Sequence, residues 1–190
     1  MRIFWFDCET TGLNPEVDQI IQFAYILTDM DFNEISSGET YVRFEKPDEF
    51  WSPEAERVHG ITLEFLKENG ISQEELRDLI ISALGSEGLP PIPAGHNIQF
   101  DLNFLRNLFP RWMFRNLLDY HPLDSMTLAQ AINFQARKTK GKWLFPSVNL
   151  STVCRVLKID PGKAHDAISD VRASMAVYQK LNNFIFKVDK

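Results

Sequence analysis

The first ten residues constrain the fold of this chain more than any other stretch. Residues 3–6, Ile-Phe-Trp-Phe, form an apolar and aromatic run that is typical of a buried strand. Asp7 and Glu9 follow, and residues two apart on a strand point to the same face. Two such carboxylates repel each other and are costly to desolvate, so a divalent cation is their simplest partner. The alternative is a strand that ends in a solvated acidic turn. Cys8, between the two acids, is expected to point into the core.

Composition restricts the class of protein. A chain of 190 residues that is 44% hydrophobic and 24% charged predicts one compact domain spanning residues 1–190. No apolar run is long enough to cross a membrane, and the N-terminus has no cleavable signal pattern. The two cysteines, Cys8 and Cys154, lie far apart, which favours a reducing cytoplasmic location over a disulfide scaffold. A net charge of −6 disfavours broad clamping of duplex nucleic acid but is compatible with a small site where metal ions supply positive charge.

The remaining pattern predicts an α/β fold. Three strands precede a series in which strands alternate with helices, so we expect a mixed five-stranded sheet, an antiparallel meander followed by parallel strands, flanked by helices on both faces. The predicted strands cover residues 3–8, 19–28, 35–44, 91–97 and 123–124. The predicted helices cover residues 53–60, 73–84 after a capping box that begins at Ser72, 101–109, 126–132 after a Ser125 cap, 149–157 and 164–181.

Two more segments carry acids where a packed sheet would have none. Asp101 sits where the fourth predicted strand passes into a helix, and open α/β sheets bind ligands at the carboxyl ends of their strands. Asp170 lies in the last predicted helix, beside the apolar stripe residues Ile168 and Val171. His165 precedes Asp170 by five residues.

These segments resemble a known family. Residues 6–13 (Phe-Asp-Cys-Glu-Thr-Thr-Gly-Leu), 95–101 (Gly-His-Asn-Ile-Gln-Phe-Asp) and 165–170 (His-Asp-Ala-Ile-Ser-Asp) are similar to the three motifs of the DEDDh (DnaQ-like) 3′–5′ exonucleases. That family includes the epsilon proofreading subunit of bacterial DNA polymerase III, RNase T and oligoribonuclease. Residues 58–62 (Val-His-Gly-Ile-Thr) also resemble an epsilon-type segment. The resemblance implies a ribonuclease H-like fold.

The resemblance also implies catalytic roles. Asp7 would bridge two Mg²⁺ or Mn²⁺ ions, Glu9 and Asp170 would complete the shell of one, and Asp101 would support the other. His165 would be the general base, because the unperturbed pKa of histidine lies near working pH. In a regular helix His165 and Asp170 would diverge by roughly 140°, so His165 is expected before the helix or in a loosened first turn. Asp166, the rival carboxylate, is assigned to the helix N-terminus.

Other residues are candidates for substrate binding. The resemblance implies that Thr10, Thr11, Gly12 and Leu13 hold the terminal nucleotide, with Leu13 as an apolar wedge, although an ordinary turn is nearly as good a reading for Thr11. His96 and Asn97 could orient a phosphate, or could bond within their loop. Asp124 is interpreted as structural, and Phe100 and Phe104 as core residues. Residues 137–143 (Arg-Lys-Thr-Lys-Gly-Lys-Trp) predict a basic loop that either is solvated or holds a single strand.

The expected activity is therefore release of nucleoside 5′-monophosphates from the 3′ end of single-stranded DNA or frayed ends. One alternative is a 3′–5′ exoribonuclease that acts on short RNA, as the opening residues 7–21 also resemble oligoribonuclease. Another is a non-catalytic nucleic-acid-binding module of the same fold, which would be expected to lack a metal carboxylate. Family members such as RNase T form dimers, so a homodimer is left open. Polymerase association is possible but not indicated, and a free-standing enzyme is expected.

Overall fold

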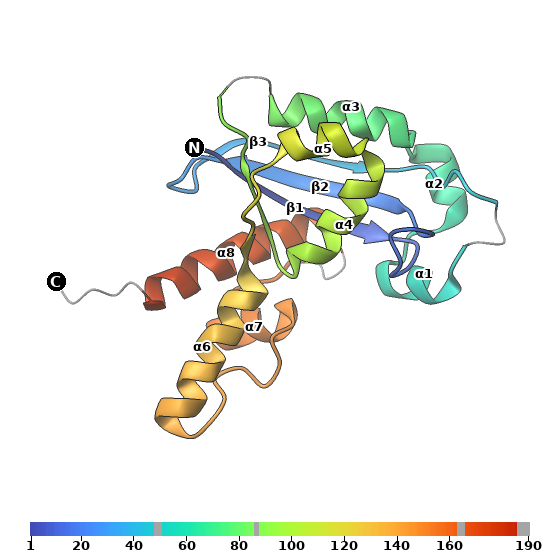
Figure 1. The fold of residues 1–190 in the computed structure, drawn as a ribbon. Coiled ribbons are helices and arrows are strands. Elements are labelled where there is room, and N and C mark those ends of the chain that lie inside the picture. The colour runs from blue at the N-terminus through green and yellow to red at the C-terminus, as the bar shows by residue number, and fades with distance from the viewer. Residues whose placement is uncertain (48–50, 86–87, 163–165, 186–190) are drawn as a thin grey trace.

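One mixed β-sheet forms the centre of the protein (Figure 1). The computed structural model describes residues 1–47, 51–85, 88–162 and 166–185. The strands are β1 (Ile3–Thr10), β2 (Ile20–Thr28), β3 (Glu34–Tyr41), β4 (Ile92–Gly95) and β5 (Leu123–Asp124). Their order is β3-β2-β1-β4-β5. β1 pairs antiparallel with β2 and β2 with β3, whereas β4 pairs parallel with both β1 and β5. The predicted sheet, a meander followed by parallel strands, is confirmed.

Helices cover both faces of this sheet, as predicted (Figure 1). They are α1 (Pro53–His59), α2 (Leu63–Asn69), α3 (Gln73–Leu84), α4 (Ile98–Leu108), α5 (Arg111–Leu117), α6 (Ser125–Lys140), α7 (Leu150–Leu157) and α8 (Ala167–Ile185). The capping box predicted for α3 is present, since Ser72 and Glu75 each accept a hydrogen bond from the other's backbone amide. In the part of the chain that the structure describes, no helix has both the length and the apolarity needed to cross a membrane.

Side chains of β1 alternate between two apolar layers. Ile3 and Trp5 pack against α8 on one face of the sheet. Phe4, Phe6 and Cys8 pack on the other face, against α3 and α4. The core position predicted for Cys8 is confirmed, because this side chain is only 6% exposed. This alternation determines which face every later residue of β1 addresses.

A separate apolar core lies away from the sheet. α6 and α7 pack against the outer side of α8 around Ala129, Phe145, Val153 and Val177. In Figure 1 this part of the chain extends below the sheet, with the end of α6 at the bottom of the view. α8 therefore contacts the sheet with one side and the α6–α7 lobe with the other.

Some boundaries differ from the sequence-based expectation. α2 and α5 were not predicted, because each is only seven residues long and shows too little helical periodicity. α4 begins at Ile98 rather than at Asp101. Asn97 adopts a left-handed conformation with φ of 63°, which turns the chain from β4 directly into the helix. Strand β3 ends at Tyr41, three residues before the predicted end.

The start and end of α6 are also corrected. Asp124, not Ser125, is the N-cap residue, and its carboxylate accepts a hydrogen bond from the amide of Met126. The helix runs to Lys140 and ends at Gly141, whose φ is 71°. Most of the predicted loop over residues 137–143 is therefore the last turn of a helix, where cations are favoured by the helix dipole.

Candidate active site

Three carboxylates meet at the end of β1 on the face that α8 covers. Asp7 and Glu9 continue the odd-numbered series of this strand, so both side chains point toward α8. Asp170 comes from the first turn of α8. Each of the three residues offers a carboxylate oxygen within 4.8 Å of those of the other two. The fold therefore brings together three of the four acids that the sequence motifs single out.

Asp101 reaches the same end of the sheet from the opposite face. It lies in the first turn of α4, is only 3% exposed, and accepts a hydrogen bond at 3.0 Å from the backbone amide of Cys8. The parallel pairing of β1 with β4 extends only to Trp5 and Ala94, so Asp101 supplies the acceptor that β4 does not provide further along. Asp101 thus stands beside the three-carboxylate cluster rather than within it.

Burial and mutual repulsion raise the pKa values of these acids. Burial, followed by the charges of Asp101, Asp170 and Glu9, raises the pKa of Asp7 well above its ordinary value. Burial, followed by the charges of Asp170 and Asp166, raises the pKa of Glu9 to about 7. Burial raises the pKa of Asp101 to about 8, even though the Cys8 amide bond opposes this. Full ionisation of the cluster is therefore costly without a compensating positive charge.

A hard divalent cation fits this arrangement. Mg²⁺ and Mn²⁺ prefer carboxylate oxygens, and the cluster presents three at a separation suited to shared coordination. A bound cation would offset the repulsion and favour the ionised form of each acid. The donor set contains no soft ligand, since Cys8 is directed into the core on the other face.

An apolar pocket of about 330 Å³ opens beside Glu9. Leu13, from the loop between β1 and β2, lines it and is 84% exposed. Val58, from α1, lines it as well and is 56% exposed. Phe100 of α4 contributes an aromatic ring. A flat apolar group bound here would cover side chains that are otherwise exposed to water.

Sequence reasoning missed part of this pocket. Phe100 was interpreted as a core residue, and it does contact the core, with its ring centre 5.0 Å from that of the buried Phe104. Val58 was noted only as part of a similar segment. Its signal in the sequence is a branched apolar residue in Pro53–His59, a segment whose other residues are charged, polar or small.

The loop after β1 is held by contacts within itself. Thr10 donates a hydrogen bond to the carbonyl of Gly12 at 2.7 Å and lines the pocket. Thr11 is 1% exposed, donates to Asp18 at 3.2 Å and accepts from the amide of Gln19 at 3.0 Å. Gly12 packs on Asp18 so closely that a Cβ would lie 2.5 Å from its carboxylate. Thr11 therefore braces the loop instead of lining the pocket.

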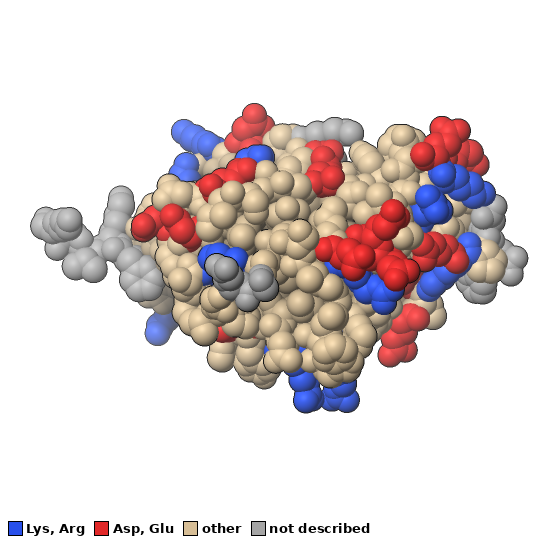
Figure 2. Space-filling model, turned by 90° about the horizontal axis from the view of Figure 1, so that it is seen from above, with Lys and Arg blue, Asp and Glu red and all other residues tan. Residues whose placement is uncertain are grey.

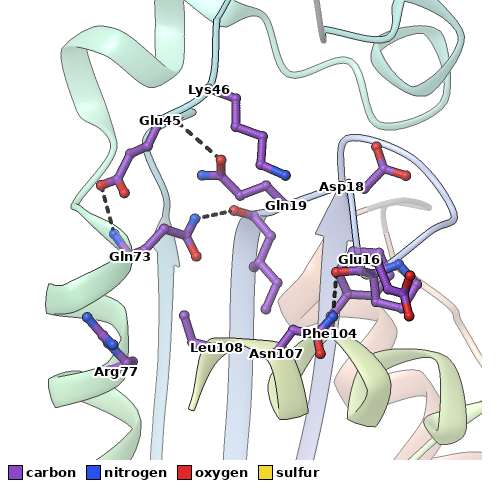
Figure 3. A pocket seen from close by; sticks show the side chains of 12 residues that line it. Glu16, Asp18, Gln19, Glu45, Lys46, Gln73, Arg77, Phe104, Asn107 and Leu108 are labelled. Carbon is purple, nitrogen blue, oxygen red and sulfur yellow. Dashed lines mark hydrogen bonds between the residues drawn. The ribbon is translucent and has the colours of Figure 1, made fainter. Parts of the chain in front are cut away.

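A second pocket, of about 530 Å³, lies behind this loop, between the start of β2 and helices α3 and α4 (Figure 3). Its polar groups bond to the chain itself. Gln73 of α3 donates to the carbonyl of Ile20 at 2.9 Å, and Asn107 of α4 donates to that of Pro15 at 2.6 Å. None of the clustered carboxylates lines it. The pocket therefore marks where helices support the loop that carries Leu13.

His96 and Asn97 occupy the turn between β4 and α4. The Nδ1 atom of His96 lies 2.8 Å from the hydroxyl of Ser125, and its Nε2 lies 2.8 Å from the carbonyl of Val148. Both ring nitrogens are thus engaged within the chain, and burial lowers the pKa of this imidazole. The structure favours the loop-bonding alternative for His96. The amide of Asn97 donates to Asp124 at 2.9 Å, which agrees with the structural interpretation of Asp124.

The predicted general base, His165, lies outside the described residues, as do Lys163 and Ala164. The described part of the last helix begins at Ala167 rather than at the predicted Ala164. Asp166 directly precedes it, accepts a hydrogen bond from the hydroxyl of Ser169 at 2.7 Å, and receives the amide of Asp170 on its carbonyl at 3.0 Å. Its predicted place at the helix N-terminus is confirmed.

A five-stranded mixed sheet with carboxylates gathered at the end of its central strand defines a ribonuclease H-like fold. Within that class the chain belongs to the exonuclease family, whose family model matches residues 4–178.

Named relatives agree with this assignment. Exodeoxyribonuclease I of Buchnera aphidicola is 30% identical over 98% of this chain and 42% of its own length. Human mitochondrial oligoribonuclease is 29% identical over 98% of this chain and 74% of its own length. The zinc-bound complex of Escherichia coli exonuclease I with single-stranded DNA superposes with a TM-score of 0.79 and 26% identity, covering 98% of this chain and 41% of that one. The chain thus spans less than half of the exodeoxyribonuclease I relatives.

Proposed function

We propose that residues 1–190 act as one exonuclease domain that removes nucleotides from the 3′ end of single-stranded DNA and releases nucleoside 5′-monophosphates. The observation that carries this proposal is the convergence of Asp7, Glu9 and Asp170 within 4.8 Å, with Asp101 alongside, next to an apolar pocket. Relatives that share the family include exodeoxyribonuclease I, and one solved neighbour holds single-stranded DNA.

The carboxylates would hold two divalent cations, Mg²⁺ or Mn²⁺. Bound there, the cations would activate water and stabilise the charge that develops on the phosphate. Asp7 is central to the cluster, because its pKa responds to each of the other three acids. Glu9 and Asp170 complete the cluster on one side, and Asp101 would act from the other. Its hydrogen bond to the Cys8 amide fixes its orientation.

The terminal nucleoside would occupy the pocket between Leu13 and Val58, with its base against Phe100. Thr10 and Gly12 line this pocket and would bring their backbone groups close to the 3′ hydroxyl. Asn97 would lie at the rim of the site. His165 would take the proton of the attacking water, a role that rests on its place in the third motif.

A second candidate is hydrolysis of short RNA. The chain matches 74% of the length of human oligoribonuclease but only 42% of the Buchnera exodeoxyribonuclease I. The identity to human oligoribonuclease, 29%, is within one point of the 30% identity to the Buchnera exodeoxyribonuclease I, although the solved neighbours that carry oligonucleotides hold DNA. Discrimination for RNA would require contacts to the 2′ hydroxyl.

The test uses matched DNA and RNA oligonucleotides, labelled at the 5′ end so that shortening from the 3′ end yields a ladder. We expect a DNA ladder with Mg²⁺ or Mn²⁺, none with a chelator, and none with Asp7→Asn. A ladder that persists in Asp7→Asn, or one that starts from the 5′ end when the label is moved, would contradict the proposal. If RNA trimers are cleaved faster than DNA trimers, the second candidate function is the correct one.

A further inference from the structure

The α6–α7 region carries a charge opposite to that of the chain as a whole. Residues 125–159 contain six lysines and arginines and no aspartate or glutamate, although the net charge of the chain is −6. Four of the six fall at the end of α6 and just beyond it: Arg137, Lys138, Lys140 and Lys142. Figure 2 shows a contrasting face, on which acidic side chains gather toward the side where α2 and the first turn of α3 lie.

A groove of about 930 Å³ lies at this basic end, between the second half of α6, the segment that follows it and the end of α8. Trp143 is 53% exposed and Phe184 is 55% exposed, and both line the groove with Leu144. Lys140 and Lys142 also line it, and none of its described lining residues is acidic. The guanidinium carbon of Arg137 lies 5.9 Å from the centre of the Trp143 ring.

Exposed aromatic rings among cations match one kind of ligand chemistry. Single-stranded nucleic acid is held without sequence preference by cations that contact phosphates and by rings on which bases stack. The guanidinium of Arg137, which lies over the Trp143 indole, adds a second planar group on which a base can stack. The phosphates and bases of a single strand complement both the cations and the exposed rings of the groove, whereas the acidic surface of a second copy would complement the cations alone.

α8 sets the distance between this groove and the carboxylate cluster. Asp170 lies in its first turn, and Phe184 lies near its other end. A straight helix advances 1.5 Å per residue, so the two positions are separated by roughly 21 Å. A stacked strand advances 3.4 Å per nucleotide, and about six nucleotides would cover that length.

We propose that the groove beside Trp143 binds the 5′ part of a single strand whose 3′ end lies at the carboxylate cluster. This inference rests on the proposed function and specifies its substrate as strands longer than about six to eight nucleotides. Shorter oligonucleotides can occupy the cluster and its pocket but cannot reach the groove. The groove therefore adds affinity for long substrates without touching the reacting phosphate.

The test measures the dissociation constants of labelled oligothymidylates of 3 to 16 nucleotides by fluorescence anisotropy, with Mg²⁺ present so that cations fill the cluster, and with non-hydrolysable 3′-terminal linkages so that no cleavage occurs. For the unmodified chain we expect affinity to rise steeply between about 5 and 10 nucleotides. In a variant that combines Trp143→Ala, Lys140→Glu and Lys142→Glu, the 12-mer should bind at least about tenfold more weakly and the step should disappear. Binding of the 3-mer should not change.

The control, matched in its two charge reversals, is Trp112→Ala with Arg111→Glu and Arg115→Glu on α5, where a more exposed tryptophan, at 70%, stands among arginines. The control should retain the length step. An unchanged step in the groove variant, or equal loss in the control, would overturn the proposal. If the groove variant changes its molar mass in light scattering but keeps its affinity for the 12-mer, the groove serves contacts between copies of the chain. That result would also overturn the proposal. A chain that shows the step but cleaves nothing would refute the proposed function alone.

Discussion

Asp7 is the residue on which the electrostatics of this protein converge. Its pKa is raised first by burial and then by the charges of Asp101, Asp170 and Glu9. Raised pKa values mean that the folded chain binds protons more tightly than the unfolded chain does. Without metal, this contribution to stability is fully present below the ordinary pKa values near 4. It is lost as pH rises toward about 7 for Glu9 and about 8 for Asp101.

The first prediction follows from that sign. Without metal, we expect the free energy of unfolding to decrease between pH 5 and pH 8, and Mn²⁺ to restore it at pH 8. Asp7→Asn removes one charge from the cluster, so it should raise metal-free stability at pH 8 and abolish the gain from Mn²⁺. Urea unfolding at both pH values, with chelator or Mn²⁺, measures this. Asp31→Asn, at an exposed turn, is the control and should behave like the unmodified chain. A metal-free free energy of unfolding that does not change with pH would show that the clustered carboxylates do not destabilise the fold when they ionise.

The second prediction concerns Leu13, whose 84% exposure means that folding does not need its side chain. Leu13→Ala should leave the melting temperature unchanged and raise KM roughly tenfold, because the apolar contact with the terminal nucleoside is lost. The value of kcat should change little. Steady-state kinetics on a short oligonucleotide measure both. Val17→Ala is the control, since this valine is 57% exposed in the same loop but does not line the pocket. Equal effects of the two substitutions would argue against the wedge.

At the scale of the element, the loop between β1 and β2 is held by one carboxylate. Asp18 accepts from the hydroxyl of Thr11 at 3.2 Å and from the amide of Asn14 at 2.8 Å, and Gly12 packs directly on it. The loop thus presents Leu13 in a defined place before any substrate arrives.

The third prediction tests this arrangement. Gly12→Ala should cost about 1–3 kcal/mol of stability, because its Cβ would overlap the Asp18 carboxylate. Asp18→Ala should also destabilise the chain by removing two hydrogen bonds. The double variant should lose less than the two single losses together, since the overlap disappears with the carboxylate. Urea unfolding of all four proteins supplies the cycle. Strict additivity would show that Gly12 and Asp18 do not interact.

Elements that carry a clear local signal were predictable from sequence. The aromatic run of β1 and the capping box of α3 each carry a local signal that the structure reproduces. α2 and α5 carry too few turns to show a period. The end of α6 was mistaken for a loop because a cluster of cations is ambiguous until Gly141 is seen to end the helix.

The candidate site was predictable in its residues more than in its contacts. Alternation along β1 places Asp7 and Glu9 on one face, and this could be read directly from the sequence. The placement of Asp101 across the sheet could not, because it depends on where β4 stops pairing. The bonding of His96 depends on Val148, far along the chain, so sequence left both of its readings open.

At the scale of the whole molecule, charge is divided between an acidic body and a basic end. The cluster repels phosphate unless cations fill it, whereas residues 137–142 attract phosphate at any metal concentration. Metal-free binding of a long strand should therefore depend on the basic end alone.

The fourth prediction is a difference in salt dependence. Each neutralised phosphate of a single strand contributes a slope of about −0.7 to the change of log affinity with log salt. We expect the slope for a 12-mer to be steeper, that is more negative, than the slope for a 3-mer by about 2–3. This difference corresponds to about four phosphates neutralised by the four cations at and just beyond the end of α6. Anisotropy titrations from low to moderate salt measure it. Equal slopes for the two lengths would mean that these cations stay in solvent.

One hydrogen bond joins the two faces of the sheet at the site. The Cys8 amide belongs to the strand that carries Asp7 and Glu9, and its acceptor, Asp101, belongs to a helix on the far face. A carboxylate accepts more strongly when it is ionised. The amide proton of Cys8 therefore reports the charge state of the cluster without any added probe. Its NMR chemical shift and its rate of exchange with solvent should both change when Asp101 ionises.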